Sequence, residues 1–367
     1  MIDYKKPPTE RDVLEWLRTG QLKLPPLRFE CLTTTAQTDS DWDLVIEAIW
    51  QEGQARFLVE CKSVSTPKVF QAAIRKVKDS SLPSDYLPLL VMPYLRESQL
   101  AELEQKQISG VDLCGNGVVV VPGRLTVYRT GAKNQFPSYS PIKNVYRKNT
   151  SMVARALLAK PNYAEVRDLR EEVNARNVLV ARWGKTAMSL GTVSKALKRL
   201  EDDLIVDRGE GVRLLQAEKL LEKLNLSYDL PQVTRIVSMK VDCEPQELPR
   251  LIREKSELVM APVVATGFSS VSWYAVMQRS DILSVYCPRG AALLEQLNGD
   301  ESDRFPNLEL LETEEQPVYF DAREENDFLW ASPVQTYLEL MTGDKRDQET
   351  ADQVRSYLLN QLAGGSR

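Results

Sequence analysis

Three charged residues with the chemistry of a metal site lie at the ends of two apolar runs. Asp43 begins the first run, and Glu60 and Lys62 lie at the end of the second. A polar stretch containing Gly53 separates the runs, which favours a hairpin turn. Folding the runs back on one another would bring Asp43 close to the other two side chains. Carboxylate oxygens are hard ligands that suit Mg²⁺ or Mn²⁺, so the spacing predicts a site for one of these ions.

Each of these residues has a predicted role. Alternate side chains of a strand share a face, so Glu60 and Lys62 should point the same way while Cys61 points into the fold. We expect Asp43 and Glu60 to bind the metal, with the main-chain carbonyl of Cys61 as a third ligand. The metal would polarise a phosphodiester and lower the pKa of a bound water. Lys62 would position that water or offset the charge of the transition state.

The chain has 367 residues and no histidine. This excludes Ser-His-Asp and Cys-His nucleophilic sites, HExxH zinc hydrolases and nucleases that use a histidine base. A carboxylate–lysine metal site is one of the few hydrolytic designs that needs no imidazole. Zinc is not expected either, because the cysteines form no CxxC pair and reduced thiols in a cytoplasm explain them. They are Cys31, Cys61, Cys114, Cys243 and Cys287.

An aspartate, a spacer and then acidic-x-Lys on the next strand resembles the pattern of the PD-(D/E)XK nuclease superfamily. Asp43 and Glu60-Cys61-Lys62 carry the resemblance, and Trp42 stands where the family has a loosely kept proline. It implies a Mg²⁺- or Mn²⁺-dependent endonuclease with an α-β-β-β-α-β-α-β core. In a chain with 27% charged residues the same spacing also arises by chance, which is the alternative.

Three further residues are accessory candidates. Glu15 and Glu30 would be extra acidic ligands, with solvated surface carboxylates as the alternative. Gln71 lies on the helix expected after the motif, where some members of the superfamily place a glutamine. A polar helix face is the alternative for this residue.

The expected elements of this first region match the order that the resemblance implies. The glycine-containing stretch 110–117 is a dense turn signal that predicts a tight turn and not a phosphate loop, because no helix follows it and no Lys-Ser/Thr completes a P-loop. The predicted helices are 10–20 with Thr9 as cap, 67–78 and 96–107, and the predicted strands are 27–34, 43–50, 56–62, 87–95 and 118–121.

Charge divides the chain into a neutral, a basic and an acidic third. Residues 1–140 have no net charge, residues 141–226 carry +6 and residues 227–367 carry −11, which gives the total of −5. We therefore predict three domains at these boundaries, in an α/β and α+β multidomain protein. No apolar run is long enough for a membrane span or a signal segment, so we expect a cytoplasmic protein.

The basic third contains an amphipathic helix at 189–201 with Ser189 as its cap. Helices are also expected at 151–159 and 163–174, and paired strands at 204–206 and 212–215 surround a glycine-containing turn. The helix and hairpin resemble a winged helix-turn-helix of bacterial regulators, which implies a helix in the major groove and a wing on phosphates. A protein–protein module with a solvated basic face is the alternative. The candidate DNA contacts are Thr192, Ser194, Lys195, Lys198 and Arg199 on the helix, and Arg208 and Arg213 on the wing.

The acidic third contains the stretches Ala265–Tyr274 and Ala331–Leu340, followed by Arg346 and a predicted helix at 349–359. Together they resemble the C-terminal domain of AbiEi-type antitoxins of abortive-infection toxin–antitoxin systems. Those antitoxins carry a winged helix ahead of this domain. Composition alone predicts an acidic domain that meets proteins and not DNA.

These patterns lead to two hypotheses. The first is a cytoplasmic, prokaryotic DNA-binding protein that cuts duplex DNA with Mg²⁺ or Mn²⁺, in defence or toxin–antitoxin biology. The alternative is a non-catalytic antitoxin-like transcriptional repressor that uses the nuclease-like fold to bind DNA or to dimerise. RNA as the nuclease substrate stays open, because a metal site does not distinguish the sugar. A homodimer is compatible with both hypotheses, and so is a protein partner for the acidic third.

Overall fold

The computed structural model describes residues 8–32, 42–136, 144–276, 282–301 and 304–364. The chain forms two compact units, Met1–Pro141 and Ile142–Arg367. The boundary predicted after residue 140 lies beside this division, whereas the one predicted after residue 226 lies inside the second unit. None of the helices in the described ranges is long and apolar enough to cross a membrane.

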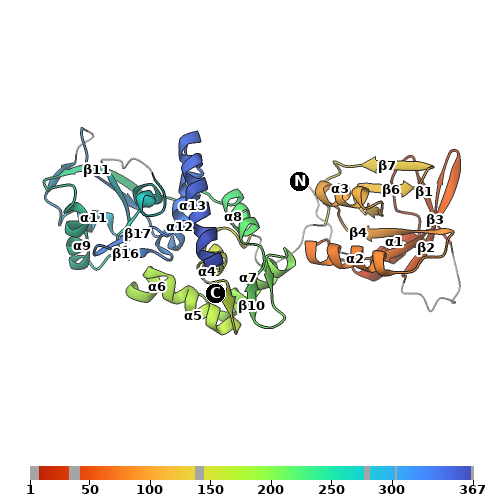
Figure 1. The fold of residues 1–367 in the computed structure, drawn as a ribbon, viewed down its shortest axis with the longest axis horizontal. Coiled ribbons are helices and arrows are strands. Elements are labelled where there is room, and N and C mark those ends of the chain that lie inside the picture. The colour runs from red at the N-terminus through yellow and green to blue at the C-terminus, as the bar shows by residue number, and fades with distance from the viewer. Residues whose placement is uncertain (1–7, 33–41, 137–143, 277–281, 302–303, 365–367) are drawn as a thin grey trace. The chain divides into compact units, whose positions relative to one another are not determined.

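The first unit is a seven-stranded mixed sheet with helices on both faces (Figure 1). Its element order confirms the predicted α-β-β-β-α-β-α-β series and adds two strands. The elements are α1 (Glu10–Arg18), β1 (Arg28–Cys31), β2 (Leu44–Trp50), β3 (Gly53–Cys61), α2 (Pro67–Asp79), β4 (Tyr86–Met92), α3 (Glu97–Gln105), β5 (Ser109–Asp112), β6 (Gly117–Val121) and β7 (Leu125–Arg129).

Strands in this sheet lie side by side in chain order, from β1 to β7. The β3–β4 and β4–β5 pairs are parallel and the other pairs are antiparallel. Alternation along β3 separates two cores. Val59 and Cys61 pack with Val13 of α1 on one face, while Phe70 and Ile74 of α2 belong to the core of the opposite face. The sheet therefore presents successive residues of β3 to different helices.

Two local predictions in this unit are wrong in part. The strand β3 begins at Gly53, so the hairpin turn is much shorter than the predicted polar stretch. The turn predicted at 110–117 is confirmed at 113–115, where Gly115 has a φ of +102°. The prediction is wrong for its first three residues, because they belong to the buried strand β5, which pairs with β4 and β6. Asp112 then shapes the turn by accepting hydrogen bonds at 2.8 Å from the main-chain N of Cys114, Gly115 and Asn116.

The second unit begins with a small helical group and a three-stranded antiparallel sheet of order β8-β10-β9. Ser189 caps α7 as predicted, by accepting a hydrogen bond from Thr192 N at 3.2 Å. The elements are η1 (Lys148–Thr150), α4 (Ser151–Ala159), β8 (Asn162–Tyr163), α5 (Val166–Arg176), α6 (Val178–Trp183), α7 (Leu190–Asp202), β9 (Val206–Asp207), β10 (Val212–Leu214) and α8 (Ala217–Leu226).

The hairpin after α7 explains why the helix predicted from Tyr163 begins later, at Val166. Tyr163 pairs with Val212 of β10, so it belongs to a strand. Gly211 has a φ of +87°, and a Cβ there would lie 2.6 Å from the carbonyl oxygen of Tyr163. Only glycine suits this turn, because other residues meet both the strained backbone and the neighbouring strand.

The last third contains a five-stranded sheet of order β12-β13-β15-β11-β14, in which β13 and β15 run parallel. Its elements are β11 (Arg235–Val241), α9 (Leu248–Leu258), β12 (Val264–Ala265), α10 (Gly267–Ser270), η2 (Val271–Trp273), β13 (Leu283–Cys287), α11 (Gly290–Leu294), β14 (Gly299–Glu301), β15 (Leu308–Glu312), η3 (Gln316–Tyr319), β16 (Arg323–Glu325), β17 (Phe328–Trp330), α12 (Pro333–Leu340) and α13 (Lys345–Gly364).

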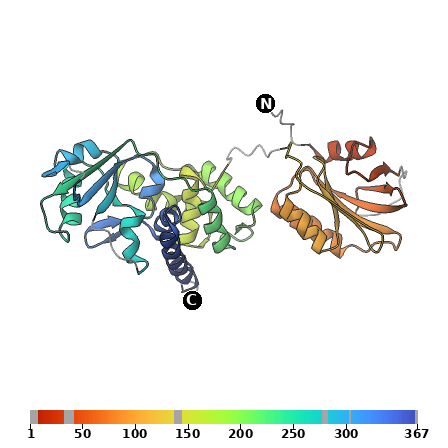
Figure 2. The same cartoon turned by 90° about the horizontal axis from the view of Figure 1, so that it is seen from above.

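The helices α12 and α13 follow this sheet in the chain and pack against the middle third. Figures 1 and 2 show this for α13, in dark blue. Leu338 of α12 and Val354 of α13 share one hydrophobic core with Leu157 of α4, Leu197 of α7 and Leu220 of α8. The middle and last thirds therefore share one hydrophobic core and pack as one unit.

Candidate active site

The β2–β3 hairpin brings the predicted acidic residues together. Leu44 pairs with Val59, which sets Asp43 opposite Glu60 on the neighbouring strand. The main-chain N of Asp43 donates to Val59 O at 3.0 Å. One carboxylate oxygen of Asp43, Oδ2, accepts from Cys61 N at 2.7 Å. Asp43 is thus held at the end of the hairpin by the strand that carries the other two residues of the motif.

Glu60 is completely buried, with 0% of its surface exposed, and it forms ion pairs with two lysines. The Nζ of Lys62 lies 2.5 Å from its Oε1. The Nζ of Lys76, from helix α2, lies 2.5 Å from its Oε2. Glu60 and Lys62 therefore point to the same face, as the strand alternation predicted. A buried carboxylate is tolerated here because both oxygens are paired with charge.

Electrostatics favours the charged form of Lys62. Burial lowers the pKa of Lys62, but its contact with Glu60 more than offsets this effect. The charges of Glu10 and Asp43 add to the increase, so the pKa is raised from 10.5. Lys62 is an ammonium at neutral pH and acts as a hydrogen-bond donor and positive charge.

Cys61 lies on the opposite face of β3, inside the core that includes Val59 and Val13. Burial raises the pKa of its thiol, and the charges of Asp43 and Glu60 raise it further. The thiol is therefore neutral and makes a poor metal ligand. Only the main-chain carbonyl of Cys61 suits the predicted role.

The donor set fits a hard divalent cation in kind. Among the described residues, no group of three or more His, Cys, Asp or Glu side chains is arranged to hold a metal ion. Two carboxylates are available here, Asp43 and Glu60. Mg²⁺ commonly takes one or two protein carboxylates and completes its shell with waters and phosphate oxygens, so two are sufficient in number. Both oxygens of Glu60 are held by ammonium groups, so a metal would compete with Lys62 and Lys76.

Within the described ranges, none of the accessory candidates forms a hydrogen bond or ion pair with Asp43, Glu60 or Lys62. Glu15 is exposed on α1. Glu30 pairs in register with Glu47 and forms an ion pair with Arg28. Glu47 is four residues along β2 from Asp43, a separation of about 13 Å. Gln71 does lie on α2, but its amide donates to Glu102 of α3 at 2.9 Å and 3.0 Å.

Two residues of the site were not predicted. Glu10, the first residue of α1, acts electrostatically on both Lys62 and Cys61. Lys76 pairs with Glu60 from α2. The signal for Lys76 was its position three residues after buried Ala73, at the border of the apolar helix face. Glu10 had a weaker signal, because it follows the cap residue and reads as an ordinary first-turn carboxylate.

The candidate DNA contacts differ in how much of their charge is already paired. Lys195 and Lys198 are exposed on α7, and neither forms an ion pair within the described part of the chain. The hydroxyl of Thr192 is 3.0 Å from that of Ser189, and Ser194 is half-buried. The three arginines each pair with a neighbouring carboxylate, as Arg199–Asp203 at 3.4 Å, Arg208–Glu201 at 3.9 Å and Arg213–Asp207 at 3.3 Å.

Comparison of the chain with protein-family models, with curated proteins and with solved structures finds no significant match.

Proposed function

We propose that the protein is a DNA-binding, metal-dependent phosphodiesterase whose active site is formed by Asp43, Glu60 and Lys62. One observation carries the proposal. The three residues converge at one end of β2 and β3, and Glu60 and Lys62 are in direct contact. The surrounding order of helices and strands agrees with the core expected for PD-(D/E)XK nucleases.

Asp43 and Glu60 would hold Mg²⁺ or Mn²⁺ with the Cys61 carbonyl, and the ion would supply Lewis acidity and an activated water. The protein's own contribution is electrostatic. Lys62 is protonated, so it donates hydrogen bonds to water or to a phosphate oxygen and does not accept a proton. Lys76 balances the buried charge of Glu60 when no cation is bound. Such fixed charges stabilise a developing negative charge without reorganisation.

DNA binding is proposed for the second unit. The series α4, β8, α5, α7 and the glycine-containing β9–β10 hairpin has the order that winged helix-turn-helix domains use, with the short helix α6 added between α5 and α7. The unpaired charges of Lys195 and Lys198 on α7 support this proposal. A role in defence or toxin–antitoxin biology, and a protein partner for the acidic last third, rest on the resemblance to AbiEi-type antitoxins.

Metal removal tests the catalytic proposal. Purified protein is incubated with supercoiled plasmid and linear duplex in Mg²⁺, in Mn²⁺ and in excess EDTA, and with single-stranded RNA in parallel. We expect cutting of DNA that depends on the metal and stops in EDTA. The Asp43→Ala variant, prepared identically, controls for a contaminating nuclease. Cutting that persists in EDTA, or in Asp43→Ala, would contradict the proposal.

The second candidate function is a non-catalytic repressor, in which the first unit binds DNA or forms a dimer. The observation that favours it is that each Glu60 oxygen lies 2.5 Å from a lysine ammonium, so a metal would have to displace one of the two lysines. Among the described residues, only Oε2 accepts a hydrogen bond, from Lys76, whereas the contact of Oε1 with Lys62 is an ion pair alone. A repressor would bind one operator sequence with high affinity and would keep that affinity in Lys62→Ala. Failure to cut in either metal, combined with such binding, selects this candidate.

Both functions place α7 in the major groove, where we expect the long side chains of Lys195 and Lys198 to reach the phosphates that border it. Replacing either lysine with alanine is expected to weaken duplex binding at all sequences and to lower the slope of log K against log[salt] by about 1. Fluorescence anisotropy over a salt series measures both quantities. Lys240→Ala, at an exposed position of β11, is the charge-matched control and should leave the slope unchanged. An unchanged slope in both α7 variants would remove this helix from the DNA interface.

A further inference from the structure

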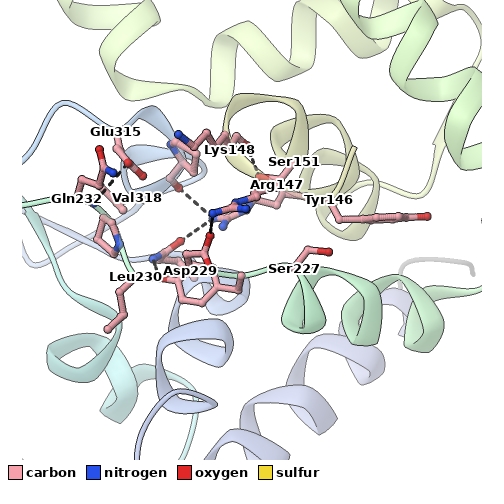
Figure 3. A pocket seen from close by; sticks show the side chains of 15 residues that line it. Tyr146, Arg147, Lys148, Ser151, Ser227, Asp229, Leu230, Gln232, Glu315 and Val318 are labelled. Carbon is pink, nitrogen blue, oxygen red and sulfur yellow. Dashed lines mark hydrogen bonds and ion pairs between the residues drawn. The ribbon is translucent and has the colours of Figure 1, made fainter. Parts of the chain in front are cut away.

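A cavity of about 170 Å³ lies in the second unit, and its lining includes none of the residues proposed for the metal site or for DNA binding (Figure 3). One side is lined by residues around η1 and the start of α4, namely Tyr146, Arg147, Lys148 and Ser151. Ser227 to Leu230, after α8, line the opposite side. Pro317 of η3 and Gln335 of α12 complete the lining. The cavity therefore joins elements of the middle third to elements of the last third.

Arg155 of α4 lines this cavity and is only 3% exposed. Its Nη1 donates to Pro317 O at 3.0 Å and to Gln335 Oε1 at 2.6 Å. Its Nε is buried and has no hydrogen-bond partner. Within the described ranges, no carboxylate forms an ion pair with this guanidinium. A buried arginine that faces a cavity therefore has both an unpaired charge and an unused donor.

Such a charge is costly unless a counter-ion is supplied. Burial lowers the pKa of Arg155 to about 10, which reflects that cost. Among the described residues Glu339 forms no ion pair with Arg155, although its charge acts on the guanidinium and raises the pKa of Arg155. Gln335 lies between the two groups, and its Nε2 donates to Glu339 Oε1 at 2.8 Å. Burial also raises the pKa of Glu339, which favours the neutral carboxyl. Glu339 thus does not replace a direct anionic partner for the guanidinium.

Two further cations and two carboxylates line the cavity, so Arg155 gives the lining its net positive charge. Arg147 and Lys148 are exposed at its rim, and Arg147 pairs with Asp229. Glu315 also lines the cavity, where it accepts a hydrogen bond from Gln232 N at 3.4 Å. Lys148 has a φ of 51°, a strained conformation for a residue other than glycine. Strain of this kind is typical of residues that clamp ligands.

We propose that this cavity binds a small oxyanion, a phosphate or carboxylate group of a small molecule, with Arg155 as its principal partner and Lys148 at the entrance. The guanidinium has donors in the planar arrangement that both groups accept. A cavity of about 170 Å³ admits several waters or one small anion, but not duplex DNA. Because the lining comes from both thirds, the bound anion would stabilise their packing in the second unit.

Thermal unfolding and calorimetric titration test the proposal, with orthophosphate, pyrophosphate and citrate as probes at constant ionic strength. The wild type is expected to bind at least one probe and to unfold at a temperature that rises with its concentration. Preference for the phosphates or for citrate separates the two oxyanion sources. Arg155→Gln should lower the affinity for the preferred probe at least about tenfold.

Lys148→Asn supplies an independent variant if Arg155→Gln does not fold. Asparagine tolerates the left-handed backbone, so the charge is removed without added strain. We expect it to weaken binding about threefold to tenfold, while Lys240→Asn, far along the chain on β11, leaves binding unchanged. No binding of any probe by the wild type at about 10 mM would overturn the proposal. Equal affinity in the wild type and in both cavity variants would also overturn it.

Discussion

Replacing Lys62 with alanine is expected to lower the rate of metal-dependent DNA cleavage by about 10²–10³-fold. Lys62 is the cation of the motif, it contacts Glu60, and its raised pKa keeps it charged. The loss should fall on the rate at saturating metal and DNA, because the variant keeps both carboxylates and the DNA-binding elements of the second unit. Single-turnover cleavage of a labelled duplex, with binding measured separately in EDTA, distinguishes these quantities.

Lys76→Ala is the matched control, because it removes the second ammonium from the same carboxylate. We expect a smaller loss of rate, within about tenfold, and tighter metal binding, because one of the two cations that compete for Glu60 is gone. Isothermal titration with Mn²⁺ measures the affinity. Equal loss of rate in the two variants would mean that both lysines only support the fold around Glu60. Full activity in Lys62→Ala would exclude the proposed active site.

The second large effect is expected from Glu339→Ala, which should destabilise the protein by about 3–5 kcal/mol. Glu339 is 1% exposed. Its carboxyl accepts from Gly267 N at 2.7 Å, from Tyr286 OH at 3.1 Å and from Gln335 Nε2 at 2.8 Å. Alanine would leave these three buried donors without their partner and open a cavity. The unfolding midpoint of the second unit should fall by about 10 °C.

This destabilisation should depend on pH in one direction. The pKa of Glu339 is raised above 4.5 by burial, so the fold stabilises the protonated form. The protonated carboxyl adds its full contribution to the free energy of unfolding at pH values below the pKa of Glu339 in the unfolded chain. That contribution is lost as the pH rises through the pKa of Glu339 in the folded protein. The difference between wild type and Glu339→Ala is therefore expected to be larger near pH 4.5 than at pH 8. Urea unfolding at several pH values measures it.

Glu349→Ala, on the exposed face of α13, is the control for this series. It should change stability by less than about 0.5 kcal/mol, with no pH dependence of the kind expected at position 339. A small effect of Glu339→Ala would mean that water replaces the carboxyl as the acceptor for the three donors.

Local order could be predicted from the sequence because it depends on near neighbours. Apolar period, caps and turn residues predicted the helices α1, α2, α4 and α7 and the β2–β3 hairpin. They missed β5 and β8. Ser109–Asp112 forms a strand only because its main chain pairs with two neighbouring strands. Tyr163 belongs to a strand because it pairs with Val212 on β10.

The sequence by itself determined that Asp43, Glu60 and Lys62 would meet, because a hairpin and the alternation of a strand are enough to bring them together. It also determined the division after the first third and the charge of α7. Only the tertiary structure decided what else surrounds Glu60, since Lys76 reaches it from a helix whose packing no spacing specifies. The same holds for the cavity at Arg155. The residues that line it are far apart in the chain, and only their packing forms a cavity beside the unpaired guanidinium of Arg155.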